Sequence, residues 1–134
     1  MALREFSSVS VGDTLPEKVI PLTRQDLVNY AGVSGDLNPI HWDDEIAKQV
    51  GLDTAIAHGM LTMGMTGRML TNYVGDGRLT KYGVRFTNQV WPGDTLTGTA
   101  TVESLEGNNL RLTVETKNQD GATVLSGYAE ARVD

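Results

Sequence analysis

The residues best suited to chemistry lie together in a stretch of twelve, 32–43, which contains Asp36, Asn38 and His41. Five positions separate the acid from the imidazole, but Gly35 and the Asn-Pro pair favour a turn that brings the two side chains together. A carboxylate beside an imidazole orients the ring and stabilises its protonated form, as acid–base catalysis requires. The same residue types also form Asx turns and helix caps, so the spacing leaves a purely structural interpretation open.

A second candidate site is the dipeptide His58-Gly59, which begins the longest helical pattern of the chain. The first N–H groups of a helix have no partner within it, and Gly59 leaves room for a ligand oxygen to approach them. Such amides would stabilise the enolate-like charge that develops on a thioester or acyl carbonyl when the α-proton is removed. The alternative is that His58 is a packed or capping residue and that position 59 is glycine only because a larger side chain would not fit.

Thr62 lies one turn into the same helical pattern. Its hydroxyl could donate to a carboxylate such as Asp36, or back-bond to the carbonyl oxygen of His58. A metal site is not expected, although the carboxylates and imidazoles of Asp36, His41, Asp43 and His58 are conceivable ligands. No pair of them has helical ligand spacing, and the chain has no cysteine thiolate.

Two short helices and a long one are expected to position these residues. The first begins after Thr23, a good N-cap, and should stop at Gly32 and Gly35, so that it leads straight into the acid-histidine turn. The second, 43–51, has aspartates at its start, where negative charge favours a helix. The third, 58–74, is apolar on more than one face and should be largely enclosed.

Glycines within the long helix and alternation after it indicate a sheet. Gly59, Gly64 and Gly67 lower helix propensity, so a sheet or ligand is expected to approach them closely. Most of the remaining chain alternates apolar and polar residues between turn signals, as antiparallel strands with one wet face do. Strands are expected at 18–22, 79–90, 95–105, 110–118 and 123–133. Consecutive hairpins would join the last four, giving an α+β fold in which a curved antiparallel sheet wraps one long helix.

Length and composition indicate a single soluble domain over residues 1–134. The net charge of -6 and the scattered basic residues give no stripe that would bind nucleic acid. The absence of cysteine excludes disulfides and thiolate nucleophiles. The chain opens without a signal-like segment and has no run of about twenty apolar residues, so we expect a cytoplasmic protein without a membrane span.

Two separate motifs carry a resemblance to a known family. They read YAGVSGDLNPIH at 30–41 and AHGMLTMG at 57–64. In this order they resemble the signature of the MaoC-like (R)-specific enoyl-thioester hydratases and dehydratases. The resemblance implies the hotdog fold, a long helix wrapped by an antiparallel sheet, and a dimer with its acyl tunnel near the subunit interface. It also implies that no metal or redox cofactor is needed.

Carried over by position, the resemblance implies that Asp36 and His41 are the catalytic dyad and that the Gly59 amide is the oxyanion donor. Thr62 falls where some family members have a serine that bonds to the aspartate. The implied supporting residues are neighbours of these groups: Asn38, His58 and Thr62.

More narrowly, the first two-thirds of the chain resembles the catalytic B subunit of actinobacterial (3R)-hydroxyacyl-carrier-protein dehydratases, which serve type II fatty-acid synthesis, including mycolic-acid elongation. Beyond Arg68 the resemblance is looser. B-type enzymes pair with a related hotdog subunit that lacks the dyad, whereas stand-alone hydratases of similar length are homodimers. The resemblance therefore leaves both kinds of dimer open.

The implied reaction is the reversible dehydration of (3R)-3-hydroxyacyl thioesters, carried by acyl carrier protein or coenzyme A, to trans-2-enoyl thioesters. The first alternative is a stand-alone (R)-specific enoyl-CoA hydratase that supplies or consumes (R)-3-hydroxyacyl-CoA. A hotdog thioesterase, which releases free thiol, and a non-catalytic acyl-binding subunit are further alternatives. The presence of both Asp36 and His41 argues against the silent subunit.

Overall fold

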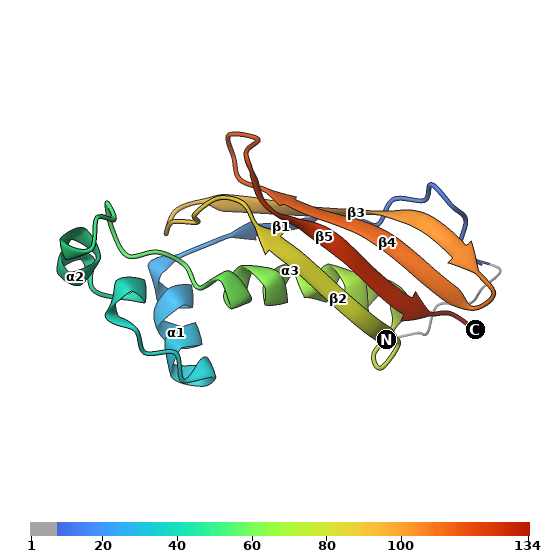
Figure 1. Ribbon diagram of the computed structural model, residues 1–134, viewed down its shortest axis with the longest axis horizontal. Helices are drawn as coiled ribbons and strands as arrows, with labels where there is room; N and C mark the ends of the chain where they lie inside the picture. Colours follow the sequence, from blue (N-terminus) through green and yellow to red (C-terminus); the bar gives the residue numbers. More distant parts are fainter. Residues whose placement is uncertain (1–7) are drawn as a thin grey trace.

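The computed structural model describes residues 8–134, and Figure 1 shows how their helices and strands are arranged. The elements in chain order are β1 (Lys18–Pro21), α1 (Arg24–Ser34), the 3-10 helix η2 (Pro39–His41), α2 (Asp44–Gln49), α3 (Gly59–Val74), β2 (Leu79–Phe86), β3 (Thr95–Glu106), β4 (Asn109–Lys117) and β5 (Thr123–Arg132). Every expected helix and strand is present. The strand expected over 79–90 ends earlier, at Phe86, and a loop follows it. In this described part, no helix is long and apolar enough to cross a bilayer.

The five strands form one antiparallel sheet in the order β1-β3-β4-β5-β2. Hairpins join β3, β4 and β5, as expected, but the expected hairpin between β2 and β3 is wrong. β2 pairs with β5 instead, and the segment after it crosses to the far side of the sheet. Backbone bonds hold the end of that segment beside β1, where Leu22 N–H donates to Asp94 and Gly93 N–H donates to Leu22. β1 and β2 are therefore the edge strands.

Helix α3 lies against one face of the sheet, and α1 and α2 lie toward one end of the molecule (Figure 1). The apolar residues that alternate along β4 are fully buried beneath this helix: Leu110, Leu112 and Val114. The helix is less enclosed than expected, because every fourth residue of one stripe is exposed: Met60, Gly64, Arg68 and Asn72. Within the core, the fully buried hydroxyls of Thr66 on α3 and Thr116 on β4 bond to each other at 2.7 Å.

The ends of α1 follow from its sequence, with one exception. Thr23 and Asp26 form a capping box at its start, and Gly35 ends it in the left-handed conformation at φ 77°. The prediction that Gly32 also stops the helix is wrong. Gly32 lies inside α1, because glycine at an interior position lowers helix propensity without breaking the hydrogen-bond ladder.

Two of the three glycines of α3 lie where a neighbouring strand approaches the helix closely, as expected. A Cβ on Gly59 would lie 3.1 Å from the ring of Phe86, and one on Gly67 would lie 3.2 Å from the ring of Tyr82. At Gly64 no atom of the described residues lies within 4 Å of that position, so close approach of the sheet does not explain this glycine. The Tyr82 hydroxyl donates to the carbonyl of Met63 at 2.7 Å, and burial raises the pKa of Tyr82 to about 12.

Gly127 on β5 lies so close to the backbone of β2 that it leaves no room for a side chain. A Cβ there would overlap the carbonyl oxygen of Gly83 and press against the backbone of Val84, both on β2. The pairing of the edge strand β2 therefore depends on this glycine, because adjacent backbones cannot separate without losing their ladder hydrogen bonds.

Candidate active site

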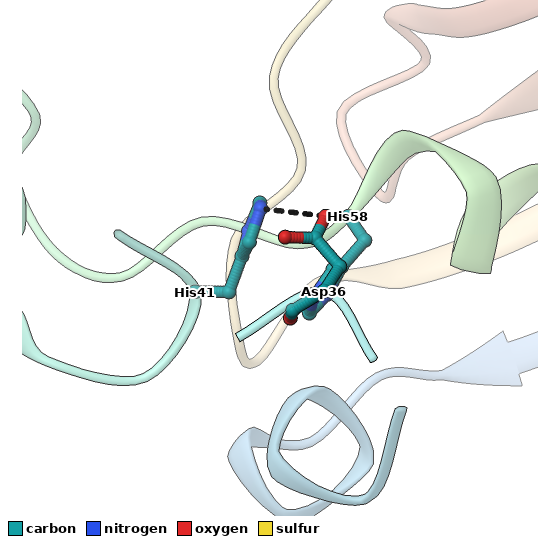
Figure 2. A group of neighbouring side chains, drawn as sticks. All are labelled: Asp36, His41 and His58. Carbon is teal, nitrogen blue, oxygen red and sulfur yellow. Dashed lines mark hydrogen bonds and ion pairs between the residues drawn. The ribbon is translucent and has the colours of Figure 1, made fainter. Parts of the chain in front are cut away.

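The acid and the imidazole of the expected dyad meet in the turn between α1 and α2. Asp36 follows the C-cap of α1, and His41 ends η2. Figure 2 shows the Asp36 carboxylate directed at the His41 ring, with Oδ2 lying 3.7 Å from Nε2. This distance is longer than a direct hydrogen bond, and one hydroxyl or water oxygen lying to the side of the two atoms could contact both.

The backbone fixes the orientation of the His41 ring. Its Nδ1–H donates to the carbonyl oxygen of Ile56 at 2.7 Å, and the Ile56 N–H in turn donates to Ile40 of η2. Because a carbonyl oxygen only accepts, the neutral ring carries its hydrogen on Nδ1 and its lone pair on Nε2. That lone pair faces Asp36, so the buried imidazole is arranged as a base.

The two oxygens of the Asp36 carboxylate have different partners. Its Oδ1 accepts the N–H of Asn38 at 3.4 Å, which closes an Asx turn, while the Asn38 side chain caps η2 by accepting from Ile40 N–H at 3.3 Å. The other oxygen faces His41, and the side chain is 53% exposed. The structural and the catalytic interpretation of this turn are therefore compatible, since one carboxylate closes the Asx turn and also faces the imidazole.

His58 contacts both residues of the dyad. Its ring is buried and stacks on the His41 ring with centroids 3.7 Å apart, and its Nε2–H donates to the backbone carbonyl of Asp36 at 3.1 Å. The Tyr30 ring of α1 meets His58 edge-on at 4.9 Å. His58 Nδ1 has no hydrogen-bond partner among the described residues.

The N-terminus of α3 presents free amides beside the dyad. His58 is the N-cap, yet its side chain makes no capping bond. The N–H groups of Leu61 and Thr62 reach the His58 carbonyl, whereas those of Gly59 and Met60 bond to none of the described residues. The first amides carry the positive end of the helix dipole, so they suit an oxygen that gains negative charge.

Thr62 makes neither of the bonds expected for it. Its Oγ1 is buried and has no partner in the described part of the chain. The bond to Asp36 is absent because that carboxylate is turned toward His41 and the Asn38 N–H. The back-bond to His58 is also absent. A buried, unpaired hydroxyl is unfavourable, so this one is available to a ligand.

Two cavities meet at Gly59. The dyad cavity, of about 320 Å³, is lined by Asp36, His41, His58 and Gly59, among other residues. The sheet-side cavity, of about 370 Å³, is lined by Gly59, Thr62, Phe86 and the loop 87–90. A ligand oxygen at the Gly59 amide would therefore lie between the two.

The site also groups three potential metal-ligating atoms, one each from Asp36, His41 and His58, all within 4.8 Å of one another. The two imidazole rings are stacked only 20° from parallel, so their in-plane lone pairs do not converge on one ion as a metal site requires. The fourth ligand considered from the sequence, Asp43, instead caps α2 by accepting from Glu45 and Ile46 N–H.

The sequence did not reveal three contributors to this site. The Ile56 carbonyl orients His41, but a backbone carbonyl has no signature in the residue types. Phe86 lies on Gly59 from a strand 27 positions along the chain, and Tyr30 contacts His58 from α1. The bulky ring of Phe86 opposite a glycine could have been suspected only if the pairing of β2 were known.

Comparisons with known proteins agree on one family. A family model described as "MaoC like domain" matches residues 7–124. The mitochondrial 3-hydroxyacyl-[acyl-carrier-protein] dehydratase of Arabidopsis thaliana is 30% identical over 142 residues, covering 98% of this chain and 85% of that protein. The (R)-specific enoyl-CoA hydratase of Rhodospirillum rubrum is 32% identical over 134 residues, covering 98% of this chain and 88% of that one.

A solved structure is similar over the same extent. The unliganded R-hydratase PhaJ1 of Pseudomonas aeruginosa superposes with a TM-score of 0.89 at 30% identity, covering 97% of this chain and 86% of that chain. The chain thus spans most of the length of these three proteins. Some longer relatives match over a part only, and the chain covers 43% or less of them.

Proposed function

Because the chain belongs to the MaoC-like domain family and has its α+β hotdog fold, we propose that it catalyses the reversible dehydration of (3R)-3-hydroxyacyl thioesters to trans-2-enoyl thioesters. Family membership makes it a hydro-lyase. The observation that carries the proposal is the pairing of the Asp36–His41 dyad with the free Gly59 amide on one cavity.

In the dehydration direction, His41 Nε2 removes the α-proton of the thioester. The electron pair of the C–H bond forms the double bond between the α- and β-carbons as the β-hydroxyl leaves. His41 then returns the proton to the leaving hydroxyl, which departs as water, so the ring ends as it began. Proton transfer of this kind contributes about 10²–10⁴-fold.

The Asp36 carboxylate stabilises the transient imidazolium and contacts the leaving hydroxyl. The 3.7 Å between Oδ2 and Nε2 supports this role, since one oxygen atom lying beside the pair can be within hydrogen-bond distance of both. In the hydration direction the same two atoms hold and activate one water molecule. Asn38 supports the dyad by donating its N–H to Asp36, and His58 does so by stacking on His41.

The Gly59 N–H binds the thioester carbonyl oxygen while enolate charge develops on it. The helix dipole and the uncapped N-terminus of α3 support this assignment. The unpaired Thr62 hydroxyl lines the neighbouring cavity one turn further on, where it can donate to the thioester. The residues themselves thus supply the base, the acid and the oxyanion donors, and no step requires a cofactor.

The protein works beside a second hotdog subunit, either a copy of this chain or a related one. In support, the edge strand β2 ends in Phe86, whose side chain is 51% exposed next to the site. An exposed strand edge with an apolar side chain is unfavourable in water, so a partner strand would stabilise it. Assays of the purified chain, alone and mixed with a candidate partner, on enoyl-CoAs of increasing length distinguish the two assemblies.

The dyad is tested by Asp36→Asn and His41→Ala, with Asp53→Asn as the matched control because Asp53 is exposed. The assay follows hydration of crotonyl-CoA and of a longer enoyl thioester, with circular dichroism to check folding. Both dyad variants should lose at least two orders of magnitude in kcat and remain folded, whereas the control keeps its activity. Near-normal hydration by both dyad variants would contradict the proposal, and release of free thiol would indicate a thioesterase.

A further inference from the structure

The Ile56 carbonyl that orients His41 lies on a connector without helix or strand structure. This connector, residues 50–58, joins α2 to α3 (Figure 1). The position of the carbonyl therefore depends on hydrogen bonds between the connector and neighbouring elements. Because His41 Nδ1 donates to this carbonyl at 2.7 Å, those bonds also decide the orientation and the tautomer of the ring.

Three successive N–H groups hold the connector in place. Those of Ile56 and Ala57 donate to backbone carbonyls of η2 and of the loop after β2, at 2.9 and 2.8 Å. The N–H of Ala55 donates to a side chain instead, the Asp44 carboxylate, with 2.9 Å between N and Oδ1. Ala55 is fully buried, so its N–H would lose its hydrogen bond without this carboxylate.

Arg24, at the start of α1, holds the Asp44 carboxylate with two hydrogen bonds. Its Nη1 donates to Oδ1 at 3.1 Å, and its Nη2 donates to Oδ2 at 3.2 Å. A planar guanidinium that engages both oxygens fixes the direction of a carboxylate. Hydrogen bonds from the Ala55 N–H and from Arg24 lower the pKa of Asp44, in keeping with a carboxylate that is engaged at both oxygens.

We propose that Asp44 is a positioning residue for the catalytic base: together with Arg24 it anchors the connector, and the connector presents the Ile56 carbonyl to His41. This inference rests on the proposed function, in which the lone pair of His41 must lie on Nε2. Asp44 lines neither of the two cavities of the site, so it acts through His41 and not on the substrate.

Removing the Asp44 carboxylate should release the connector at Ala55, next to the carbonyl that His41 needs. The Nδ1–H of the ring then loses its fixed acceptor. The neutral ring can carry its hydrogen on Nε2 instead, and in that form Nε2 cannot accept the α-proton of the thioester.

The first measurement is the tautomer of His41, which involves no substrate. Long-range proton–nitrogen correlation spectra at about pH 9, where an imidazole is ordinarily neutral, distinguish a hydrogen on Nδ1 from one on Nε2. The chain has two histidines, and the wild type should show one ring of each kind, since His41 donates from Nδ1 and His58 from Nε2. Asp44→Ala should add the Nε2–H form of His41 and leave His58 unchanged.

The second measurement is the rate of crotonyl-CoA hydration. Asp44→Ala should lower kcat about tenfold or more, as a small displacement of a catalytic group does, and should change KM less than about twofold. Asp44→Asn should lose less, because its amide oxygen can still accept the Ala55 N–H. Glu45→Gln is the matched control, since it removes the same charge from the same turn of α2, and Glu45 is exposed. This control should keep the wild-type spectrum and kcat.

An unchanged His41 spectrum in a folded Asp44→Ala chain would overturn the proposal, as would an unchanged kcat. If circular dichroism shows that this variant does not fold, Arg24→Gln decides, because it releases the carboxylate and leaves the Ala55 bond in place. It should change the spectrum and kcat in the same direction by a smaller factor, and no change in either would overturn the proposal. If the wild-type chain hydrates no enoyl thioester, the proposed function fails, while the spectra still test how His41 is positioned.

Discussion

Replacing Thr62 with valine should make the protein more stable and less active. Valine keeps the branched shape of the side chain and exchanges its hydroxyl for a methyl group. The Thr62 side chain is 2% exposed and its Oγ1 has no partner among the described residues. An unpaired buried hydroxyl costs about 1–3 kcal/mol, so its removal should raise the free energy of unfolding by about 1 kcal/mol or more. For a chain of this length that corresponds to about 4 °C in Tm.

The same substitution should lower kcat/KM about tenfold or more, because it removes a hydrogen bond to the thioester. Thr66→Val on the next turn of α3 is the matched control. The Thr66 hydroxyl already bonds to Thr116 at 2.7 Å, so this variant leaves a buried partner unpaired and should lower stability by about 1–3 kcal/mol. Two substitutions of the same type on one helix thus have opposite expected effects on stability.

Urea denaturation and thermal melting give the stability of both variants, and initial rates of crotonyl-CoA hydration give kcat and KM. A Thr62→Val chain that is less stable than wild type would refute the reasoning, since the hydroxyl would then have a partner. A more stable chain with full activity would show that the hydroxyl is only a packing defect and does not contact substrate.

Three further predictions test separate features. Gly59→Ala should reduce kcat/KM at least tenfold, because the added Cβ hinders a ligand oxygen at the amide. The loss of stability should be small, since the exposed Phe86 ring 3.1 Å from that Cβ can shift. A kcat/KM equal to that of the wild type would argue against the oxyanion role. Gly127→Ala should lower the free energy of unfolding by about 3 kcal/mol, since its Cβ would overlap the backbone of β2; a loss under about 1 kcal/mol in urea denaturation would contradict this. Tyr82→Phe should cost about 1 kcal/mol through loss of the bond to Met63. Because the folded state raises the pKa of Tyr82 from 10.0 to about 12, its stabilising contribution is complete below pH 10 and is lost as the pH rises toward 12; alkaline melting curves should therefore fall more steeply for wild type than for Tyr82→Phe.

The extent to which the fold could be predicted depended on the range of the interactions. The start of α1 and its end at Gly35 are visible in the sequence because a capping box and a left-handed glycine are local features. Alternation likewise identified the strands. The partner of β2 could not be inferred in this way, since alternation records which face of a strand is buried and carries no information about its neighbour.

The sequence by itself determined which groups are available: an acid and an imidazole on one turn, and a glycine at the start of a long helix. Residue types and short spacings suffice for this, because turns and helix ends are set by neighbouring residues. Only the tertiary structure decided how these groups are used. It brought the Ile56 carbonyl to His41 and left the Thr62 hydroxyl without a partner among the described residues. It also placed Phe86 against Gly59, the residue that two cavities share. These contacts join segments that are distant in sequence, and they exist only once the sheet has closed over α3.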